Sequence, residues 1–253
     1  PNLDALAADG LKMSNLYAAS ACSPTRSMLL SGTTSHKAGM GTMYNDQSPK
    51  QLGQPGYEGY MNKDVVSIST LLKDAGYHTY MTGKWHLGYE DDQSAYARGF
   101  ERSFSLLQGG GHHFDDKPMT IDHDTSWYRE NGKRVELPDD FFSSEFYTDK
   151  IINYIESDRE DGKPFFAYLA YTAPHWPLQA PADYIDKYKG KYDAGYQELT
   201  EKRLSALKNM GIISGKDITT EAALTKLMYL LATDDLPQDF KTLFETPLRG
   251  EMS

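Results

Sequence analysis

The chain contains a single cysteine, and the residues around it have types and spacing that could do chemistry. Cys22 lies in the run Cys22-Ser23-Pro24-Thr25-Arg26, where the proline favours the first turn of a helix. Arg26 follows Cys22 by four residues and projects from the same side of that helix one turn later. The free N–H groups and the dipole of a helix N-terminus favour anions. The sequence therefore predicts a nucleophile and a permanent positive charge together, where a sulfate or phosphate group could bind.

The pattern Cys-x-Pro-x-Arg resembles the first signature of the type I sulfatases. Two further segments resemble later signatures of that family, and they follow in the family's order. Residues 76–88 read Gly-Tyr-His-Thr-Tyr-Met-Thr-Gly-Lys-Trp-His-Leu-Gly, and residues 173–177 read Ala-Pro-His-Trp-Pro. Residues 1–7 resemble the helix that precedes the cysteine in sulfatases. The likeness to bacterial arylsulfatases is strongest over residues 1–213 and then fades.

The resemblance implies a catalytic role for each conspicuous side chain. In the family a maturation enzyme oxidises the cysteine to Cα-formylglycine, whose hydrated aldehyde attacks the sulfur of a sulfate monoester. Carried over to this chain, Cys22 becomes the formylglycine and Arg26 holds its hydrate. Lys84 and His175 bind the sulfate, His175 is also the candidate acid for the leaving oxygen, and His86 is the base that re-forms the aldehyde. The implied activity is arylsulfatase-like hydrolysis of a small-molecule or saccharide sulfate ester.

The resemblance also implies one divalent cation, usually calcium, bound by the formylglycine at Cys22 and by carboxylate and amide oxygens, which suit such an ion. In the family the first aspartate pair precedes the segment with which this chain begins, and a later Asp-Asn pair is commonly followed by Gly. No Asp-Asn-Gly is found here; Asp234 and Asp235 follow a helical pattern, and residues 247–250 resemble sequence that follows the Asp-Asn pair. We therefore expect an incomplete sulfatase catalytic domain, lacking both ends, whose other metal ligands lie outside this chain.

Other interpretations of the same residues stay open. A phosphate- or phosphonate-monoester hydrolase of the same superfamily shares the cysteine motif. The missing metal ligands favour a catalytically inactive remnant that binds anions or a partner. A thiol hydrolase that uses Cys22 with His86 has only the presence of both residues in its favour. A lone cysteine is also commonly a buried, inert one.

Composition narrows the class of protein. A chain of 253 residues with a net charge of −10 suits one α/β domain and argues against a nucleic-acid partner, which would call for a basic face. Any anion pocket must therefore be locally positive. No apolar run is long enough to cross a membrane. One cysteine excludes an internal disulfide and fits cytosol or periplasm; we expect the bacterial periplasm or secretion in preference to the cytoplasm.

Strand and helix patterns alternate along the chain. Strands are predicted over residues 11–17, 77–82 and 164–171, the last of them buried. Helices are predicted over residues 1–8, 24–30, 64–75, 146–155, 195–210 and 220–231. Gly32 is expected to end the second of these helices and Asp64 to cap the third. This order favours an α/β fold with a mostly parallel central sheet flanked by helices on both faces. The resemblance implies the alkaline phosphatase-like version of that fold, with its C-terminal part missing. Each motif follows a strand, so its residues should meet at the carboxyl ends of the strands.

Two segments are expected to lie outside this core. Residues 89–140 are predicted to be a long polar insertion at the rim of the active site, a wall that selects the substrate. Within it His112, His113 and Asp115 could bind a metal, but a solvated loop is favoured, because adjacent histidines in a glycine-rich run are not preorganised. Residues 214–253 are expected to form a helical tail.

Overall fold

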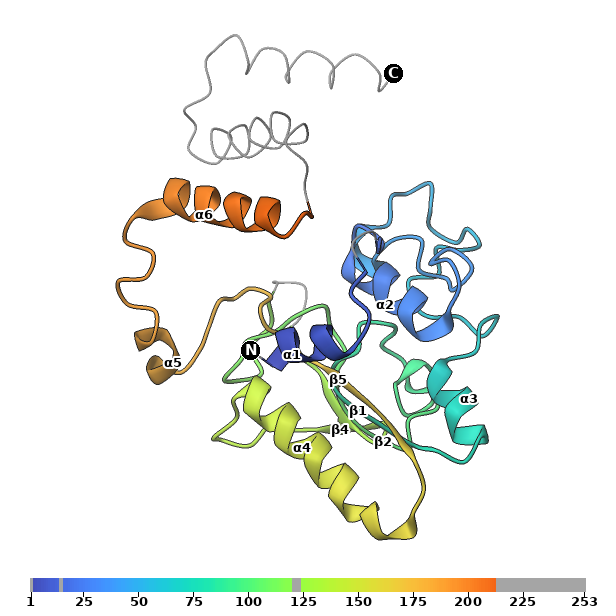
Figure 1. Cartoon of the computed structure of the whole chain (residues 1–253). Helices are drawn as coiled ribbons and strands as arrows, with labels where there is room; N and C mark the ends of the chain where they lie inside the picture. The colour runs from blue at the N-terminus through green and yellow to red at the C-terminus, as the bar shows by residue number, and fades with distance from the viewer. Residues whose placement is uncertain (1, 14–15, 120–123, 213–253) are drawn as a thin grey trace. The chain divides into compact units, whose positions relative to one another are not determined.

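The computed structural model describes residues 2–13, 16–119 and 124–212, and Figure 1 traces the chain. The described residues form two compact units, one within residues 16–182 and one from the described parts of residues 1–15 and 183–253. The larger unit holds the three motifs. The helix predicted over residues 220–231, the helical tail, and Asp234 and Asp235 lie outside the described residues.

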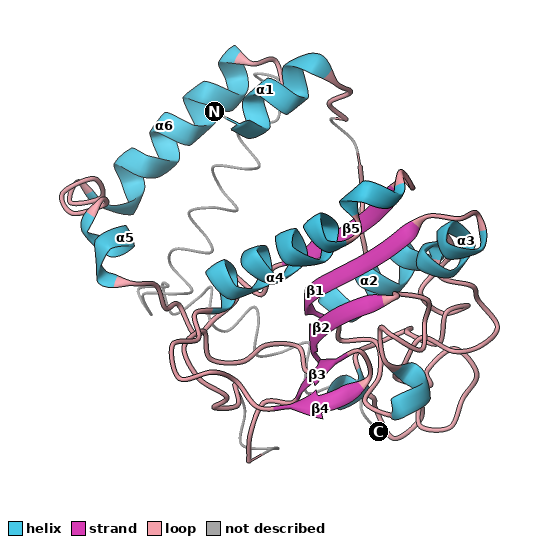
Figure 2. Cartoon of the chain, turned by 90° about the horizontal axis from the view of Figure 1, so that it is seen from below, coloured by secondary structure: helices cyan, strands magenta, loops and turns pink. Residues whose placement is uncertain are grey.

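A five-stranded sheet forms the centre of the larger unit, in the order β4-β3-β2-β1-β5 (Figure 2). β1 (His78–Lys84) pairs in parallel with both β2 (Arg102–Leu106) and β5 (Phe165–Ala170). β3 (Tyr128–Glu130) pairs antiparallel with β2 and with β4 (Lys133–Val135). β2, β1 and β5 therefore confirm the predicted parallel arrangement. The antiparallel strands β3 and β4 make the sheet as a whole mixed.

One face of the sheet is covered by α4 (Ser143–Ser157). Ile151 and Tyr154 of this helix form a core cluster with Tyr80 of β1. These two residues belong to one apolar stripe, because positions three and four apart share a face of a helix. The helix predicted over residues 146–155 is thus confirmed and extends further at both ends.

On the other face, α3 (Ile68–Asp74) contacts both β1 and α2 (Cys22–Ser31), and Arg26 of α2 donates a hydrogen bond to Lys84 O at the end of β1. Leu30 of α2 shares a core cluster with Met81. Met81 follows Tyr80 directly in β1, and successive strand residues point to opposite faces. Helices therefore flank both faces of the sheet, as predicted.

The end of α2 is the one predicted from the sequence, whereas the residue that caps the start of α3 is a different one. α2 ends at Gly32, which adopts the left-handed conformation with φ 67° and donates its N–H to Met28 O. α3, however, begins after Ser67, whose hydroxyl accepts the N–H of Ser69. The prediction that Asp64 caps this helix is wrong, because Ser67 supplies the same hydrogen bond three residues later.

Two strand predictions are corrected by the structure. The strand predicted over residues 11–17 is absent from its described residues 11–13 and 16–17, and Leu11 and Tyr17 are exposed. These residues pair with no strand of the sheet, and a strand needs such a neighbour for its backbone hydrogen bonds. The strand at residues 164–171 is present as β5, but most of it is half-buried. It lies at the edge of the described sheet, with β1 on one side only.

The expected irregular insertion at residues 89–140 instead contributes β2, β3 and β4. Phe104 of β2 and Tyr128 of β3 are buried with Tyr147 of α4, so these short strands complete the core under that helix. The sequence gives little sign of these strands, because each is only three to five residues long and lies between polar loops. That the remaining loops of this segment select the substrate stays a prediction.

The smaller unit contains α1 (Asn2–Asp9), α6 (Gly195–Asn209) and most of α5 (Ala182–Asp186). The helices predicted over residues 1–8 and 195–210 are confirmed by α1 and α6. α6 ends before Gly211, which has φ 68° and donates its N–H to Lys208 O. No helix of the described residues is long and apolar enough to cross a membrane.

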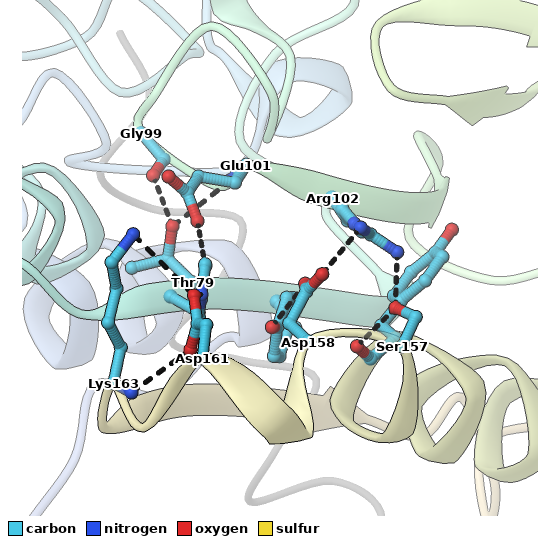
Figure 3. Close-up of polar contacts among 11 residues, drawn as sticks. Thr79, Gly99, Glu101, Arg102, Ser157, Asp158, Asp161 and Lys163 are labelled. Atoms are coloured by element: carbon cyan, nitrogen blue, oxygen red, sulfur yellow. Dashed lines mark hydrogen bonds and ion pairs between the residues drawn. The ribbon is translucent and has the colours of Figure 1, made fainter.

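Polar contacts tie the start of β1 to its neighbours. The ring of His78 lies between two carboxylates, with Nδ1 2.9 Å from Glu101 and Nε2 2.7 Å from Asp161. Figure 3 shows the adjoining contact, in which Arg102 of β2 reaches Asp158 after the end of α4. These side chains hold β1, β2 and the end of α4 together at the N-terminal edge of the sheet.

Candidate active site

The first two motifs meet where α2 begins and β1 ends. Cys22 is the first residue of α2, Lys84 is the last of β1, and His86 follows two residues later. Cys22 Sγ lies 3.3 Å from His86 Nδ1, although 64 residues separate them in sequence. The predicted gathering at the carboxyl ends of the strands is therefore present for these two motifs.

Arg26 is fixed by two hydrogen bonds. Its Nη1 donates to the backbone oxygen of Lys84 at 2.7 Å and to the hydroxyl oxygen of Tyr168 at 3.0 Å. The guanidinium therefore connects α2 to the ends of both β1 and β5. Tyr168 was not among the predicted site residues. Only its place in a strand was visible in the sequence, and the side chain that it would meet was not.

Lys84 is a buried cation, with 3% of its surface exposed. Burial lowers the pKa of its ammonium group, and the charge of Arg26 lowers it further, whereas Cys22 acts in the opposite direction. Two positive groups held this close repel each other. An anion bound between them would relieve that repulsion, so the site is locally positive in a chain of negative net charge.

His86 has an unusual backbone and an unusual ring. Its φ is 56°, a left-handed conformation that is uncommon outside glycine. Burial, and then the charges of Lys84 and Arg26, lower the pKa of its imidazole to about 3. The ring is therefore neutral at neutral pH, and one of its nitrogens can accept a proton.

His175 comes from the third motif and is half-buried in the loop that follows β5. Its Nδ1 lies 2.8 Å from the backbone oxygen of Trp176. Because a carbonyl oxygen only accepts, Nδ1 carries the proton and Nε2 is the nitrogen left to bind another group. A Cβ atom built on Gly110 would lie 3.2 Å from His175 Nδ1, and one built on Gly109 would lie 2.6 Å from His86 Cε1. Gly109 thus lies against His86, and Gly110 lies against His175.

A cavity of about 290 Å³ opens beside these groups. It is lined by side chains and backbone from four parts of the chain, including His86, Met43, Tyr89, Gly109, Gly110 and Met119. The glycines and the two methionines were not predicted as site residues. The run Gly109-Gly110-Gly111 is their sequence signal, and it predicts only a loop.

Among the described residues, no group of three or more His, Cys, Asp or Glu side chains is placed to hold a metal ion. His112 Nδ1 lies 3.2 Å from Asp115 Oδ1, but His113 is 2% exposed and its Nδ1 contacts Ser143 Oγ at 2.7 Å. The solvated-loop prediction is therefore wrong for His113. This side chain ties the loop to the start of α4, a contact that local sequence does not reveal.

Comparisons with known proteins agree on one family. The family model described as Sulfatase matches residues 1–236. The chain is 45% identical over 223 residues to an uncharacterized sulfatase of Schizosaccharomyces pombe, a match that covers 84% of this chain and 40% of that protein. It is 43% identical over 215 residues to the arylsulfatase of Klebsiella aerogenes, covering 84% of this chain and 46% of that one. The chain thus spans less than half the length of these curated relatives.

Solved structures give the same result at lower identity. BT4656 in complex with its substrate D-glucosamine-2-N,6-O-disulfate has a TM-score of 0.55 and 27% identity, over 76% of this chain and 33% of that chain. Ps i-CgsB in complex with k-i-k-neocarrahexaose also has a TM-score of 0.55, with 26% identity over 66% of this chain and 38% of that chain.

Proposed function

Because this chain belongs to the sulfatase family, we propose that it hydrolyses sulfate monoesters as an arylsulfatase-like enzyme. Such esters need a positioned nucleophile, cations for the sulfuryl oxygens and an acid for the leaving oxygen. The observation that carries the proposal is the contact of Cys22 with His86, beside Arg26 and Lys84. This contact supports the assignment of a nucleophile position, a neutral base and two cations to one site.

The nucleophile is proposed to be a formylglycine made from Cys22 by a maturation enzyme, as the family implies. When present, this group would supply a hydrated aldehyde that attacks sulfur with one hydroxyl and uses the second to release sulfate as the aldehyde re-forms, a release that an ordinary serine could not achieve. Arg26 lies one helical turn beyond this position. Its guanidinium is always charged and is held by Lys84 O and Tyr168, so it can orient oxygen atoms there and offset their negative charge.

Lys84 is proposed to bind a sulfuryl oxygen. Its ammonium is buried, and the effective dielectric around a buried charge is low, so its attraction for an anion is stronger than that of a surface lysine. Burial lowers the pKa of Lys84 most, and the repulsion from Arg26 that lowers it further would be compensated when the sulfate group arrives. The same argument accounts for how a chain of net charge −10 can bind an anionic substrate.

The two histidines are proposed to move protons at opposite sides of the sulfate group. His86 is neutral and faces the Cys22 position, so its Nδ1 can take a proton from a hydroxyl held there. His175 turns Nδ1 to a backbone oxygen, which leaves Nε2 to bind the sulfate and, when protonated, to give a proton to the leaving oxygen.

A divalent cation, expected to be calcium, is also implied by the family. The described residues do not fit such an ion, since no suitable cluster of ligands occurs among them. We therefore assign it no step. The relatives act on different esters: the Klebsiella protein is an arylsulfatase, and BT4656 was solved with a sulfated sugar. Both substrate classes, small aryl sulfates and sulfated saccharides, fit the proposal.

The test compares hydrolysis of 4-nitrophenyl sulfate and 4-nitrophenyl phosphate by the 253-residue chain. We expect a higher kcat/KM for the sulfate ester, and a loss of about 100-fold or more in His86→Gln, the usual effect of removing a general base. His36→Gln is the matched control, because His36 is exposed and its ring contacts the Tyr57 hydroxyl, away from the proposed site residues. Faster cleavage of the phosphate ester, or full activity in Cys22→Ala, would contradict the proposal.

A further inference from the structure

A second histidine is buried next to the loop that carries His175. His113 follows the glycine run 109–111 and is 2% exposed. Its Nδ1 lies 2.7 Å from Ser143 Oγ, and its Nε2 lies 3.4 Å from the backbone oxygen of His175. None of the roles proposed above uses this ring, although it contacts the backbone of a residue that is proposed to give a proton to the substrate.

The partners of His113 determine its tautomer. A carbonyl oxygen only accepts hydrogen bonds, so the proton lies on Nε2, which donates to His175 O. Nδ1 then has a free lone pair and accepts the hydroxyl proton of Ser143. Both nitrogens of the ring are therefore bonded, as a buried polar side chain requires.

The backbone of His113 makes a matching pair of bonds. Its carbonyl oxygen accepts the N–H of Ser143 at 2.8 Å, and its N–H donates to Gln179 Oε1 at 2.9 Å. Ser143 therefore bonds both the ring and the backbone of His113 from one side, and His175 and Gln179 do the same from the other. His113 thus joins two segments that are distant in sequence.

The segment on the Ser143 side is rigid. Ser143 is the first residue of α4 and is 1% exposed. Tyr147 and Ile151 of the same helix are buried in core clusters with residues of the sheet. The first N–H groups of a helix have no partner inside it, and His113 O accepts one of them. His113 is therefore fixed to the core of the larger unit.

The segment on the His175 side has few bonds of its own. Among its described residues, the loop between β5 and α5 forms one internal backbone hydrogen bond, from His175 N to Thr172 O at 3.0 Å. Pro174 and Pro177 have no N–H with which to add another. The bonds from His113 therefore anchor this loop to α4.

The ring of His175 is held by the same stretch of chain. A Cβ atom built on Gly110 would lie 3.2 Å from His175 Nδ1, so the backbone of Gly110 packs close beside the ring. The same Nδ1 donates to Trp176 O. Residues 110–113 thus contact both the side chain and the backbone of His175, and a shift of this backbone would move the ring.

On the basis of the sulfatase activity proposed above, we propose that His113 is a positioning residue. Through His175 O it fixes the loop, and it thereby holds His175 Nε2 where this atom can give a proton to the leaving oxygen of the ester. His113 itself transfers no proton. Ser143 sets its tautomer, and α4 is its support.

Two amide substitutions separate the two nitrogens of the ring. In His113→Gln the amide nitrogen reaches the position of Nε2 and can still donate to His175 O, whereas the shorter side chain in His113→Asn reaches only the position of Nδ1. We would measure kcat/KM on 4-nitrophenyl sulfate and on phenyl sulfate, whose leaving oxygen is more basic and depends more on an acid. Loss of positioning slows phenyl sulfate more, whereas loss of folded protein slows both esters equally.

His113→Asn should lower kcat/KM for phenyl sulfate about 10-fold more than for 4-nitrophenyl sulfate, a part of the roughly 10²–10⁴-fold that a general acid contributes. His113→Gln should restore the wild-type ratio of the two esters. Ser143→Ala is the matched control, because it removes the hydroxyl on Nδ1 and leaves the bond to His175 O, so its ratio should equal that of wild type. A wild-type ratio in His113→Asn, or an equal shift in Ser143→Ala, would overturn the inference.

Gln179→Leu covers the case in which His113→Asn does not fold. It removes the acceptor of the His113 N–H from a half-buried position. The ratio should shift in the same direction by a smaller factor, and an unchanged ratio would count against the inference.

Hydrogen exchange separates this inference from the proposed function, because it needs no turnover. The amide of His175 donates to Thr172 O. Its exchange should be about fivefold faster in His113→Asn than in wild type, the effect of one lost hydrogen bond on local opening, and unchanged in Ser143→Ala.

The two results together distinguish the failures. If this difference in exchange is seen but wild type cleaves neither ester, the anchoring of His175 stands and the proposed activity fails. If the esters are cleaved but the ratio and the exchange rate are the same in wild type and His113→Asn, the activity stands and this inference fails.

Discussion

Removing the hydroxyl of Tyr168 should weaken catalysis without weakening the fold. The hydroxyl oxygen accepts one of two hydrogen bonds from Arg26 Nη1, at 3.0 Å, and the other goes to Lys84 O. In Tyr168→Phe the ring keeps its stacking against Phe100, so the core is preserved. Arg26 would keep one anchor and gain freedom to rotate away from the nucleophile position.

The size of the effect follows from the type of bond lost. A hydrogen bond that involves a charged group contributes about 1.5–3 kcal/mol, and about 1.4 kcal/mol corresponds to a factor of ten in rate. Since the bond to Lys84 O remains, we expect the lower end of that range, a loss of about 10-fold in kcat/KM. Most of the loss should be in kcat, because Arg26 acts on the nucleophile and Lys84 still binds the sulfate.

Tyr171→Phe is the matched control for this prediction. Tyr171 is three residues further along, and its hydroxyl contacts Thr148 Oγ1 at 2.6 Å on α4, not the site. We would measure kcat and KM on 4-nitrophenyl sulfate and the melting temperature of both variants. If Tyr168→Phe is as active as Tyr171→Phe, or if its loss of activity follows a loss of stability, the role assigned to Tyr168 in positioning Arg26 is wrong.

Three further predictions concern the sheet and the base. Gly83→Ala should lower the free energy of unfolding by about 3 kcal/mol or more, measured by urea denaturation. The reason is that φ of Gly83 is 107° and the new Cβ would lie 2.1 Å from Ala170 O. A loss of less than about 1 kcal/mol would refute this close approach. Hydrogen bonds to Asp161 and then to Glu101 raise the pKa of His78. Its stabilising contribution is therefore complete below the unfolded pKa of about 6.5 and is lost as pH rises through the higher folded pKa. His78→Gln should lower the free energy of unfolding more at pH 5.5 than at pH 9, and an equal loss at both pH values would contradict this prediction. The pKa of His86, about 3, predicts that kcat/KM does not fall from pH 7 to about pH 5; a fall centred near 6.5 would show an ordinary histidine.

Local patterns in the sequence were sufficient for the elements that form within one segment. The spacing of Ile151, Tyr154 and their neighbours predicts α4, and the glycine at position 32 predicts the end of α2. The first two motifs also predict which residues lie near one another, since one opens a helix and the other ends a strand. In each case the interactions that form the element are made between residues close in sequence, or the position follows from a known motif.

The features that sequence analysis missed depend on contacts between distant segments. Tyr168 reaches Arg26 across 142 residues, and Gly110 is defined by Met119 and His175 beside it. His113 was expected in solvent but is buried against Ser143. No local periodicity encodes such pairs, because each residue's role is set by what the fold brings to it.

The mass of the tryptic peptide covering residues 13–26 tests the central claim most directly. The protein should be produced in bacteria shown to contain the formylglycine-generating enzyme. The account predicts a peptide in which the thiol of Cys22 has been replaced by an aldehyde, at the position that contacts His86 Nδ1. An unmodified cysteine under those conditions would contradict a sulfatase mechanism for this chain and leave an anion-binding site without its nucleophile.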